Sequence, residues 1–503
     1  MNDRPNIVLI MTDQQRADFS RAEGYPLDPT PFVDELGREG VRFRHAYTPM
    51  PTCGPARCSL MTGRWPKATR VRENAALGHI TALTDLPTTM REQGYRVLLS
   101  GKNHTYLSEN DFDWSSMYMH DGGGRPDRRT EQDAAVDEWL KSLDHGVHPE
   151  PTPYPLENQP PYRVVRDAMA GLDQTDADAP FFLWLSFAEP HNPYQVPEPY
   201  FSMFPEDGMP DRAAGPEAID ARGGTWRWLR DLIEEKRPGY DDAWRRYRAS
   251  YLGMIRLIDD QIRRFVDWLD RSGQLDDTVL IFMSDHGDYA GEYGLQRKGV
   301  GLPEVLTRVP LVFRGPGIVA NDAMREEFVS LVDIYPTICD MLGLPIPDGV
   351  QGRSLWPILA GEPFPEDEFR SIYAELGVGG IHYTEHERPP LHFPYEGPTF
   401  DELNSVTQSG NMKMVRMGDW KLTMDSQGNG EMYDLAIDPF ELDNRYGTPE
   451  HADRQLALMT DLLRWTIRTE DDLPVARYVR KRPDRNWYAR LSPPGESGAM
   501  SPA

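Results

Sequence analysis

Four short apolar runs, each followed closely by polar side chains, are the feature that most limits how this chain can fold. Continuous apolar runs of this length, rich in β-branched and aromatic residues, are typical of parallel strands that helices cover on both faces. The runs and the polar residues after them are 7–10 before Asp13 and Gln14, 95–99 before Lys102 and His104, 181–185 before His191, and 279–282 before Asp285 and His286.

Segments with helical spacing lie between these runs. Pro31 opens a predicted helix over 30–39, apolar residues recur at helical spacing over 248–269, and 331–342 is a third candidate. Alternating strands and helices predict an α/β fold with a doubly wound, mostly parallel sheet. Because ligands of such sheets gather beyond the carboxyl ends of the strands, the polar residues after the four runs are expected to meet there.

The chain changes character after about residue 365, where short candidate strands and a turn at 428–430 replace the long apolar runs. We therefore predict a catalytic domain over 1–365, a smaller α+β domain with an antiparallel sheet over 366–480, and a C-terminal tail over 481–503. The tail could serve as an oligomer arm, and the oligomeric state stays open. Two stretches are long for connections: 145–162 is rich in proline, and 199–240 is rich in glycine, proline and tryptophan. Both are expected to be active-site walls or partly mobile surface.

The net charge of −26 and a single tight basic cluster at 480–482 disfavour proteins that bind nucleic acid or an anionic membrane through a basic face. No apolar stretch approaches the ~20 residues that span a bilayer. The short apolar run near the start does not resemble an export signal. A cytoplasmic protein is expected, or a periplasmic one if a leader was removed.

Cys53, Cys58 and Cys339 are the only cysteines, too few for a disulfide framework, and the first two lack a second Cys/His pair for structural zinc. Cys53 opens the segment Cys-Gly-Pro-Ala-Arg, followed by Thr-Gly-Arg at 62–64. This pattern resembles the signature of the sulfatase family, in which the first cysteine is oxidised to formylglycine. The resemblance extends along most of the chain through Thr-Asp-Gln at 12–14, Gly-Lys-Asn-His at 101–104, Pro-His at 190–191, Ser-Asp-His-Gly at 284–287 and Lys-Gly at 298–299.

The resemblance implies an alkaline phosphatase-like fold and hydrolysis of a sulfate monoester on an aryl, alkyl or carbohydrate alcohol. In the family's reaction the hydrated aldehyde attacks sulfur with one hydroxyl, and loss of the proton from the other expels sulfate. The implied catalytic residues are Cys53 as the nucleophile precursor, Arg57 beside it, Lys102 and Lys298 on the sulfuryl oxygens, His104 as base and His191 as acid. Other histidines, among them His45, His120, His145 and His451, are expected to be structural.

The resemblance also implies one divalent metal ion, held by Asp13, Gln14, Cys53, Asp285 and His286. The family often has a second aspartate in place of Gln14 and an asparagine in place of His286. Calcium is expected first. Manganese and magnesium are alternatives, because this donor set has one anion fewer than the family's usual all-oxygen set and includes one imidazole.

Substrate contacts are less visible in the sequence. Lys102, His191 and Lys298 are expected to bind the sulfate, and His382, His386 or Arg388 the group beyond it. The implied partners are a sulfated small molecule or saccharide and a formylglycine-generating enzyme. Two alternatives stay open: a phosphonate or phosphate ester hydrolase that uses the same aldehyde, and a non-catalytic metal-binding relative.

Overall fold

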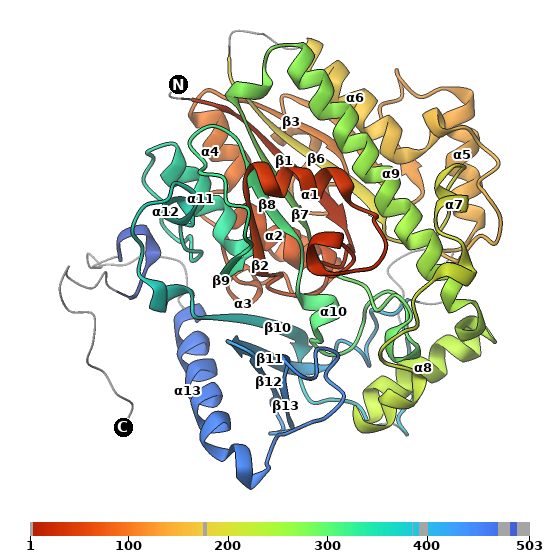
Figure 1. Cartoon of the computed structure of the whole chain (residues 1–503), viewed down its shortest axis with the longest axis vertical. Coiled ribbons are helices and arrows are strands. Elements are labelled where there is room, and N and C mark those ends of the chain that lie inside the picture. Colours follow the sequence, from red (N-terminus) through yellow and green to blue (C-terminus); the bar gives the residue numbers. More distant parts are fainter. Residues whose placement is uncertain (1–3, 175–178, 385, 392–400, 471–482, 490–503) are drawn as a thin grey trace.

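The computed structural model describes residues 4–174, 179–384, 386–391, 401–470 and 483–489. A nine-stranded sheet with the order β5-β4-β3-β6-β1-β7-β8-β2-β9 forms its centre (Figure 1). The strands are β1 Asn6–Asp13, β2 Val41–Tyr47, β3 Arg96–Gly101, β4 Trp114–Met119, β5 Gly122–Gly123, β6 Phe181–Pro190, β7 Thr278–Ser284, β8 Leu311–Arg314 and β9 Arg325–Ser330. The pairs β1·β6, β1·β7, β3·β6, β3·β4 and β2·β9 are parallel, whereas β8 runs antiparallel to both neighbours and β5 antiparallel to β4. The predicted mostly parallel α/β sheet is confirmed.

Helices cover both faces of this sheet, as the continuous apolar runs predict. In β1, Ile7 and Leu9 pack on one face against α2 and α11, while Val8 and Ile10 pack on the other against α1, α6 and α9. The helices are α1 Pro31–Glu39, α2 Cys53–Thr62, α3 Pro66–Thr69, α4 Leu86–Glu92, α5 Glu131–Ser142, α6 Pro160–Gln174, α7 Tyr200–Met203, α8 Gly224–Lys236, α9 Trp244–Arg271, α10 Glu304–Thr307, α11 Ile334–Met341, α12 Trp356–Leu359 and α13 Ala452–Thr469.

The three predicted helices correspond to α1, α9 and α11 with its preceding 3-10 turn. Helix α8 was not expected, because it lies within the stretch 199–240, which is rich in glycine and proline, and its N-cap and first residue are Gly223 and Gly224. Its buried residues Trp226, Leu229 and Ile233 recur at helical spacing and pack in a local apolar cluster.

A second, antiparallel sheet with the order β10-β11-β12-β13 follows, and α13 packs against it (Figure 1). Its strands are β10 Ser371–Gly379, β11 Gly410–Met417, β12 Trp420–Asp425 and β13 Gly430–Asp434, which confirms the antiparallel sheet predicted for this part of the chain. The domain boundary at residue 365 stays a prediction.

Of the predicted tail, residues 483–489 are described and contain a short 3-10 helix, Asp484–Asn486. The rest of the tail and the basic cluster at 480–482 lie outside the described residues. Within the described ranges, no helix combines the length and the apolar character that crossing a membrane requires.

Candidate functional site

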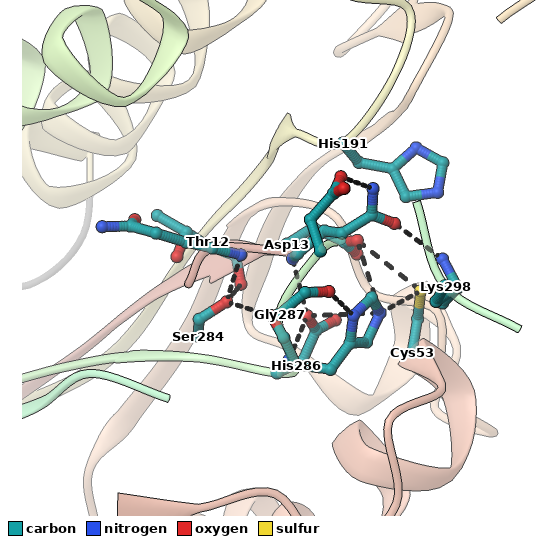
Figure 2. Close-up of polar contacts among 12 residues, drawn as sticks. Thr12, Asp13, Cys53, His191, Ser284, His286, Gly287 and Lys298 are labelled. Carbon is teal, nitrogen blue, oxygen red and sulfur yellow. Dashed lines mark hydrogen bonds and ion pairs between the residues drawn. The ribbon is translucent and has the colours of Figure 1, made fainter. Parts of the chain in front are cut away.

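Four potential metal ligands converge at the carboxyl edge of the large sheet. Asp13 ends β1, Cys53 begins α2, and Asp285 and His286 directly follow β7. One donor atom from each lies within 4.8 Å of the other three, and all four residues are buried. Figure 2 shows the Cys53 sulfur facing the His286 ring and the Asp13 carboxylate. The distances are 3.1 Å from Cys53 Sγ to His286 Nε2 and 3.6 Å to Asp13 Oδ1.

Strand register and a helix terminus bring these residues together. The parallel pairing of β1 and β7 places Thr12 opposite Ser284. Asp13 and Asp285, the residues that follow this pair, therefore lie at the same edge of the sheet. Cys53 is the first residue of α2, where backbone N–H groups lack helical partners. Pro55, two residues later, therefore breaks no helical hydrogen bond.

Arg57 joins the two aspartates of the cluster from one turn further along α2. Its Nε donates to Asp285 Oδ2 at 2.7 Å and its Nη2 to Asp13 Oδ2 at 3.1 Å. Its Nη1 donates to Ser186 Oγ at 2.8 Å and to the Lys102 carbonyl at 2.9 Å. Both carboxylates thus give Oδ2 to Arg57 and leave Oδ1 facing the cluster.

Two lysines flank Cys53. Lys102 Nζ donates to Asp13 Oδ2, and Lys298 Nζ donates to Gln14 Oε1 at 2.9 Å. Gln14 Nε2 donates in turn to Asp288 Oδ2 at 2.6 Å, which fixes the amide with its oxygen toward the lysine. Gln14 has a left-handed φ of 72°, a conformation that strains a non-glycine residue and that often marks a functional site.

Glycine is required where Lys102 enters the site. Gly101 ends β3 with φ of 116°, and a Cβ there would lie 1.7 Å from the carbonyl oxygen of Ser186 on β6. The glycine of the Gly-Lys-Asn-His motif therefore allows the close approach of two strands just before the lysine.

Nearby cations stabilise the charged forms of Asp13 and Cys53. Burial by itself would raise the pKa of Asp13, but Lys102 and Arg57 hold it well below the usual value. Burial and the Asp13 charge likewise act to raise the pKa of the Cys53 thiol, yet Lys102, Lys298 and His286 lower it to about 6. Burial and the charge of Asp13 raise the pKa of Asp285.

His286 has the tautomer that a metal ligand needs. Its Nδ1 lies 2.8 Å from the Gly287 carbonyl, which places a proton on Nδ1 and leaves the lone pair of Nε2 facing the cluster. Burial lowers the pKa of His286, but the nearby Asp285 and Cys53 raise it above its ordinary value overall. Two carboxylate oxygens and one imidazole nitrogen around a common centre fit a divalent cation.

The two other expected catalytic histidines are held neutral. His104 follows β3 with a left-handed φ of 49°, and among the described residues its buried Nδ1 has no hydrogen-bond partner. Burial, followed by Lys102, lowers its pKa well below the ordinary value. His191 Nδ1 lies 2.9 Å from the Asn192 carbonyl. Burial and the neighbouring His120 lower the His191 pKa in the same way.

Three further residues belong to this site although the sequence did not point to them. His120, expected to be structural, lies 2.9 Å from Lys102 through Nε2 and stacks on His191. Ser186 bonds Arg57. Glu402, from the C-terminal part, accepts from Arg297 at 3.0 Å and lies 3.7 Å from Lys298 Nζ. His120 directly follows β4, a strand that no continuous apolar run marks in the sequence.

The three residues expected to contact the group beyond the sulfate lie elsewhere. His382 lines a cavity of about 570 Å³ between the start of α8 and the second sheet, whose lining does not include the cluster residues. Its Nε2 lies 3.8 Å from Asp425 Oδ2. His386 and Arg388 are exposed. Their roles stay predictions.

Comparisons with known proteins agree with this geometry. A family model described as Sulfatase matches residues 5–344. An arylsulfatase of Clostridium perfringens is 28% identical over 484 residues, which cover 90% of this chain and 92% of that protein. The multifunctional alkaline phosphatase superfamily protein PehA of Trinickia caryophylli is 30% identical over 500 residues, covering 89% and 92%.

Among solved structures, the phosphonate monoester hydrolase of Agrobacterium radiobacter superposes with a TM-score of 0.75 at 28% identity, covering 93% of this chain and 96% of that one. This likeness confirms the expected alkaline phosphatase-like fold. Because the family model spans more than half of the chain, the protein belongs to the sulfatase family of the alkaline phosphatase superfamily and is an enzyme of that family.

Proposed function

We propose that this enzyme hydrolyses sulfate monoesters of an aryl, alkyl or carbohydrate alcohol, with formylglycine formed from Cys53 and one divalent metal ion. The observation that carries the proposal is the position of Cys53. Its Sγ lies at the amino end of α2, 3.1 Å from His286 Nε2, with Lys102 and Lys298 close enough to lower its pKa.

Asp13, Gln14, Asp285 and His286 would hold the metal ion, with the Cys53 side chain beside it. Supporting this, Asp13 and Asp285 each direct Oδ1 toward the cluster, and His286, whose Nδ1 lies at the Gly287 carbonyl, turns Nε2 toward it. A bound divalent cation would supply Lewis acidity and acidify a coordinated hydroxyl. Formylglycine would supply a hydrated aldehyde as nucleophile, which a formylglycine-generating enzyme must first make from Cys53.

Side chains of this protein would bind the sulfate, position the metal ligands and transfer protons. Lys102 and Lys298 bind the sulfuryl oxygens as point charges, and Arg57 holds Asp13 and Asp285 in place. Neutral His104 can accept a proton, as a base must. His191 must gain a proton on Nε2 before it can protonate the leaving oxygen, and a bound sulfate ester favours this because its negative charge raises the pKa of a nearby imidazole.

A phosphonate or phosphate ester is the second candidate substrate. It is favoured by the structural likeness to a phosphonate monoester hydrolase at 28% identity. A sulfuryl group and a phosphoryl group are both tetrahedral and anionic, so the same lysines could bind either one. The non-catalytic reading is disfavoured because the expected nucleophile, ligands and lysines converge in one buried site.

Two measurements test the proposal. The first is the mass of tryptic peptide 45–57, in which Cys53 is the only cysteine, from protein produced with and without a formylglycine-generating enzyme. Conversion exchanges sulfur for oxygen with loss of two hydrogens, whereas a peptide that stays a thiol in converting cells would contradict the nucleophile. The Cys53→Ala variant, which has no thiol to convert, is the negative control for this mass change.

The second measurement compares kcat/KM for an aryl sulfate and an aryl phosphonate monoester with the same phenol. We expect the converted enzyme to prefer the sulfate. A clear preference for the phosphonate would select the second candidate. If fully converted, metal-loaded enzyme turned over neither of them, nor an alkyl or a carbohydrate sulfate, both hydrolase candidates would be contradicted.

A further inference from the structure

His120 makes two contacts that join two expected catalytic groups. It follows β4, whereas Lys102 follows β3 and His191 follows β6. The His120 and His191 rings are stacked, with centroids 3.7 Å apart and planes inclined by 15°. His120 Nε2 lies 2.9 Å from Lys102 Nζ.

The proton positions at these contacts follow from donor chemistry. Lys102 is an ammonium ion paired with Asp13, and an ammonium ion can only donate. His120 Nε2 must therefore accept, so the ring is neutral and carries its proton on Nδ1. His191 carries its own ring proton on Nδ1, which donates to the Asn192 carbonyl. Two neutral imidazoles can stack closely, whereas two imidazolium ions would repel each other.

His145 completes the group without making the same contacts. Its ring meets those of His120 and His191 edge to face at 6.4 and 6.5 Å. No hydrogen bond from its ring to Lys102 is seen among the described residues, and its carbonyl accepts from Arg297. His145 therefore serves as a matched control for His120: it has the same side chain and the same neighbourhood, but lacks the hydrogen bond and the face-to-face stack.

We propose that His120 is a positioning residue that fixes the Lys102 ammonium against the sulfuryl group and the His191 imidazole against the leaving oxygen. One side chain thereby sets the geometry of charge stabilisation and of leaving-group protonation together. The assignment rests on the proposed sulfatase function for its kinetic consequences, but not for its hydrogen bond.

The kinetic test compares His120→Leu, His120→Gln and His145→Gln in converted, metal-loaded enzyme, with a series of aryl sulfates whose phenols differ in acidity. Misplacing catalytic groups by about 1 Å can cost ~100-fold, so we expect His120→Leu to lose about 10- to 100-fold in kcat. The loss should grow as the phenol becomes a poorer leaving group, because poorer leaving groups depend more on protonation by His191.

The conservative variant separates the two contacts. The amide oxygen of His120→Gln can accept from Lys102, but the side chain cannot stack on His191 as a ring does. Part of the kcat loss should therefore recover, while the steeper dependence on leaving-group acidity remains. His145→Gln should keep the wild-type dependence. An unchanged dependence in His120→Leu, or an equal change in His145→Gln, would overturn the proposal.

An independent readout does not require turnover. In protein labelled with ¹⁵N-histidine and loaded with magnesium or calcium, the His120 signals, assigned by their loss in His120→Gln, should show a protonated Nδ1 and an unprotonated Nε2. A proton on Nε2 would overturn the assignment even in an active sulfatase. If instead the converted wild-type enzyme hydrolyses no sulfate ester, the proposed function fails and this measurement still decides the hydrogen bond.

Discussion

Arg57 Nε donates to Asp285 Oδ2 at 2.7 Å, and neither side chain is exposed to solvent. The same guanidinium donates to Asp13, which also accepts from Lys102, so Arg57 is the cation that the two carboxylates at the ends of β1 and β7 share. A buried ion pair costs desolvation energy, and removing one partner leaves the other as an uncompensated buried charge. We therefore expect Arg57 to stabilise the fold of the metal-free protein as well as to position the metal ligands.

Arg57→Ala should lower the free energy of unfolding of metal-free protein by about 3–5 kcal/mol and should also weaken metal binding. Arg263→Ala is the matched control, because Arg263 pairs with Glu35 at 2.9 Å where both side chains are about 40% exposed. That exposed pair should contribute no more than about 1 kcal/mol. Urea unfolding of both variants checks this, and equal losses would contradict the assignment of Arg57.

Strand ends could be predicted from the sequence where the strand is a continuous apolar run. Asp13, Asp285 and His286 were found this way, because strands buried on both faces consist almost entirely of apolar residues. His120 was not, because β4 alternates buried and more exposed positions and contains two serines, so no apolar run marks it.

Contacts that depend on tertiary packing left no local signal. Glu402 contacts Lys298 from the C-terminal part of the chain, and no hydrophobic pattern in the sequence around either residue predicts this contact. The direction of Gln14 was also not predictable, because it depends on a left-handed backbone and on Asp288 and Tyr194, which lie far away in sequence.

Metal affinity should rise with pH through the neutral range. The pKa of His286 lies above 6.5 in metal-free protein, so a proton still competes for Nε2 at pH values where a free imidazole is neutral. Below that raised pKa, affinity should fall about tenfold per pH unit. Calorimetric metal titration across pH checks this. His286→Asn should bind more weakly and lose this part of the pH dependence, and a flat profile in the wild type would contradict the ligand assignment.

Cys53 should titrate far below the other two thiols. Before conversion and without metal its pKa is about 6, whereas burial raises the pKa values of Cys58 and Cys339 to about 12. Thiolate absorbance measured on unconverted protein should therefore rise as pH increases through about 6. Cys53→Ala should abolish this rise, and a transition that persists in the variant would assign it to another group.

Glu304 links the two sheets, and its charge should stabilise the fold in a defined pH range. It accepts from Arg416 at 2.7 Å and from Lys421 at 3.1 Å, both on the second sheet, and from Tyr47 on β2. Burial opposes ionisation, but Lys421 and Arg416 lower the pKa of Glu304 from 4.5 to about 2. The stabilisation is therefore complete above pH 4.5 and is lost as pH falls through about 2.

Glu304→Gln should consequently cost about 3–5 kcal/mol at ~pH 7, because Arg416 and Lys421 stay buried with less opposing charge. The difference from the wild type should shrink as pH falls below 4.5, since only the wild type loses an ionic interaction there. Urea midpoints of both proteins at several pH values measure the difference. If it stayed constant down to the lowest pH at which both proteins fold, the stabilisation would come from the shape and hydrogen bonds of the side chain, which glutamine largely retains, rather than from its charge.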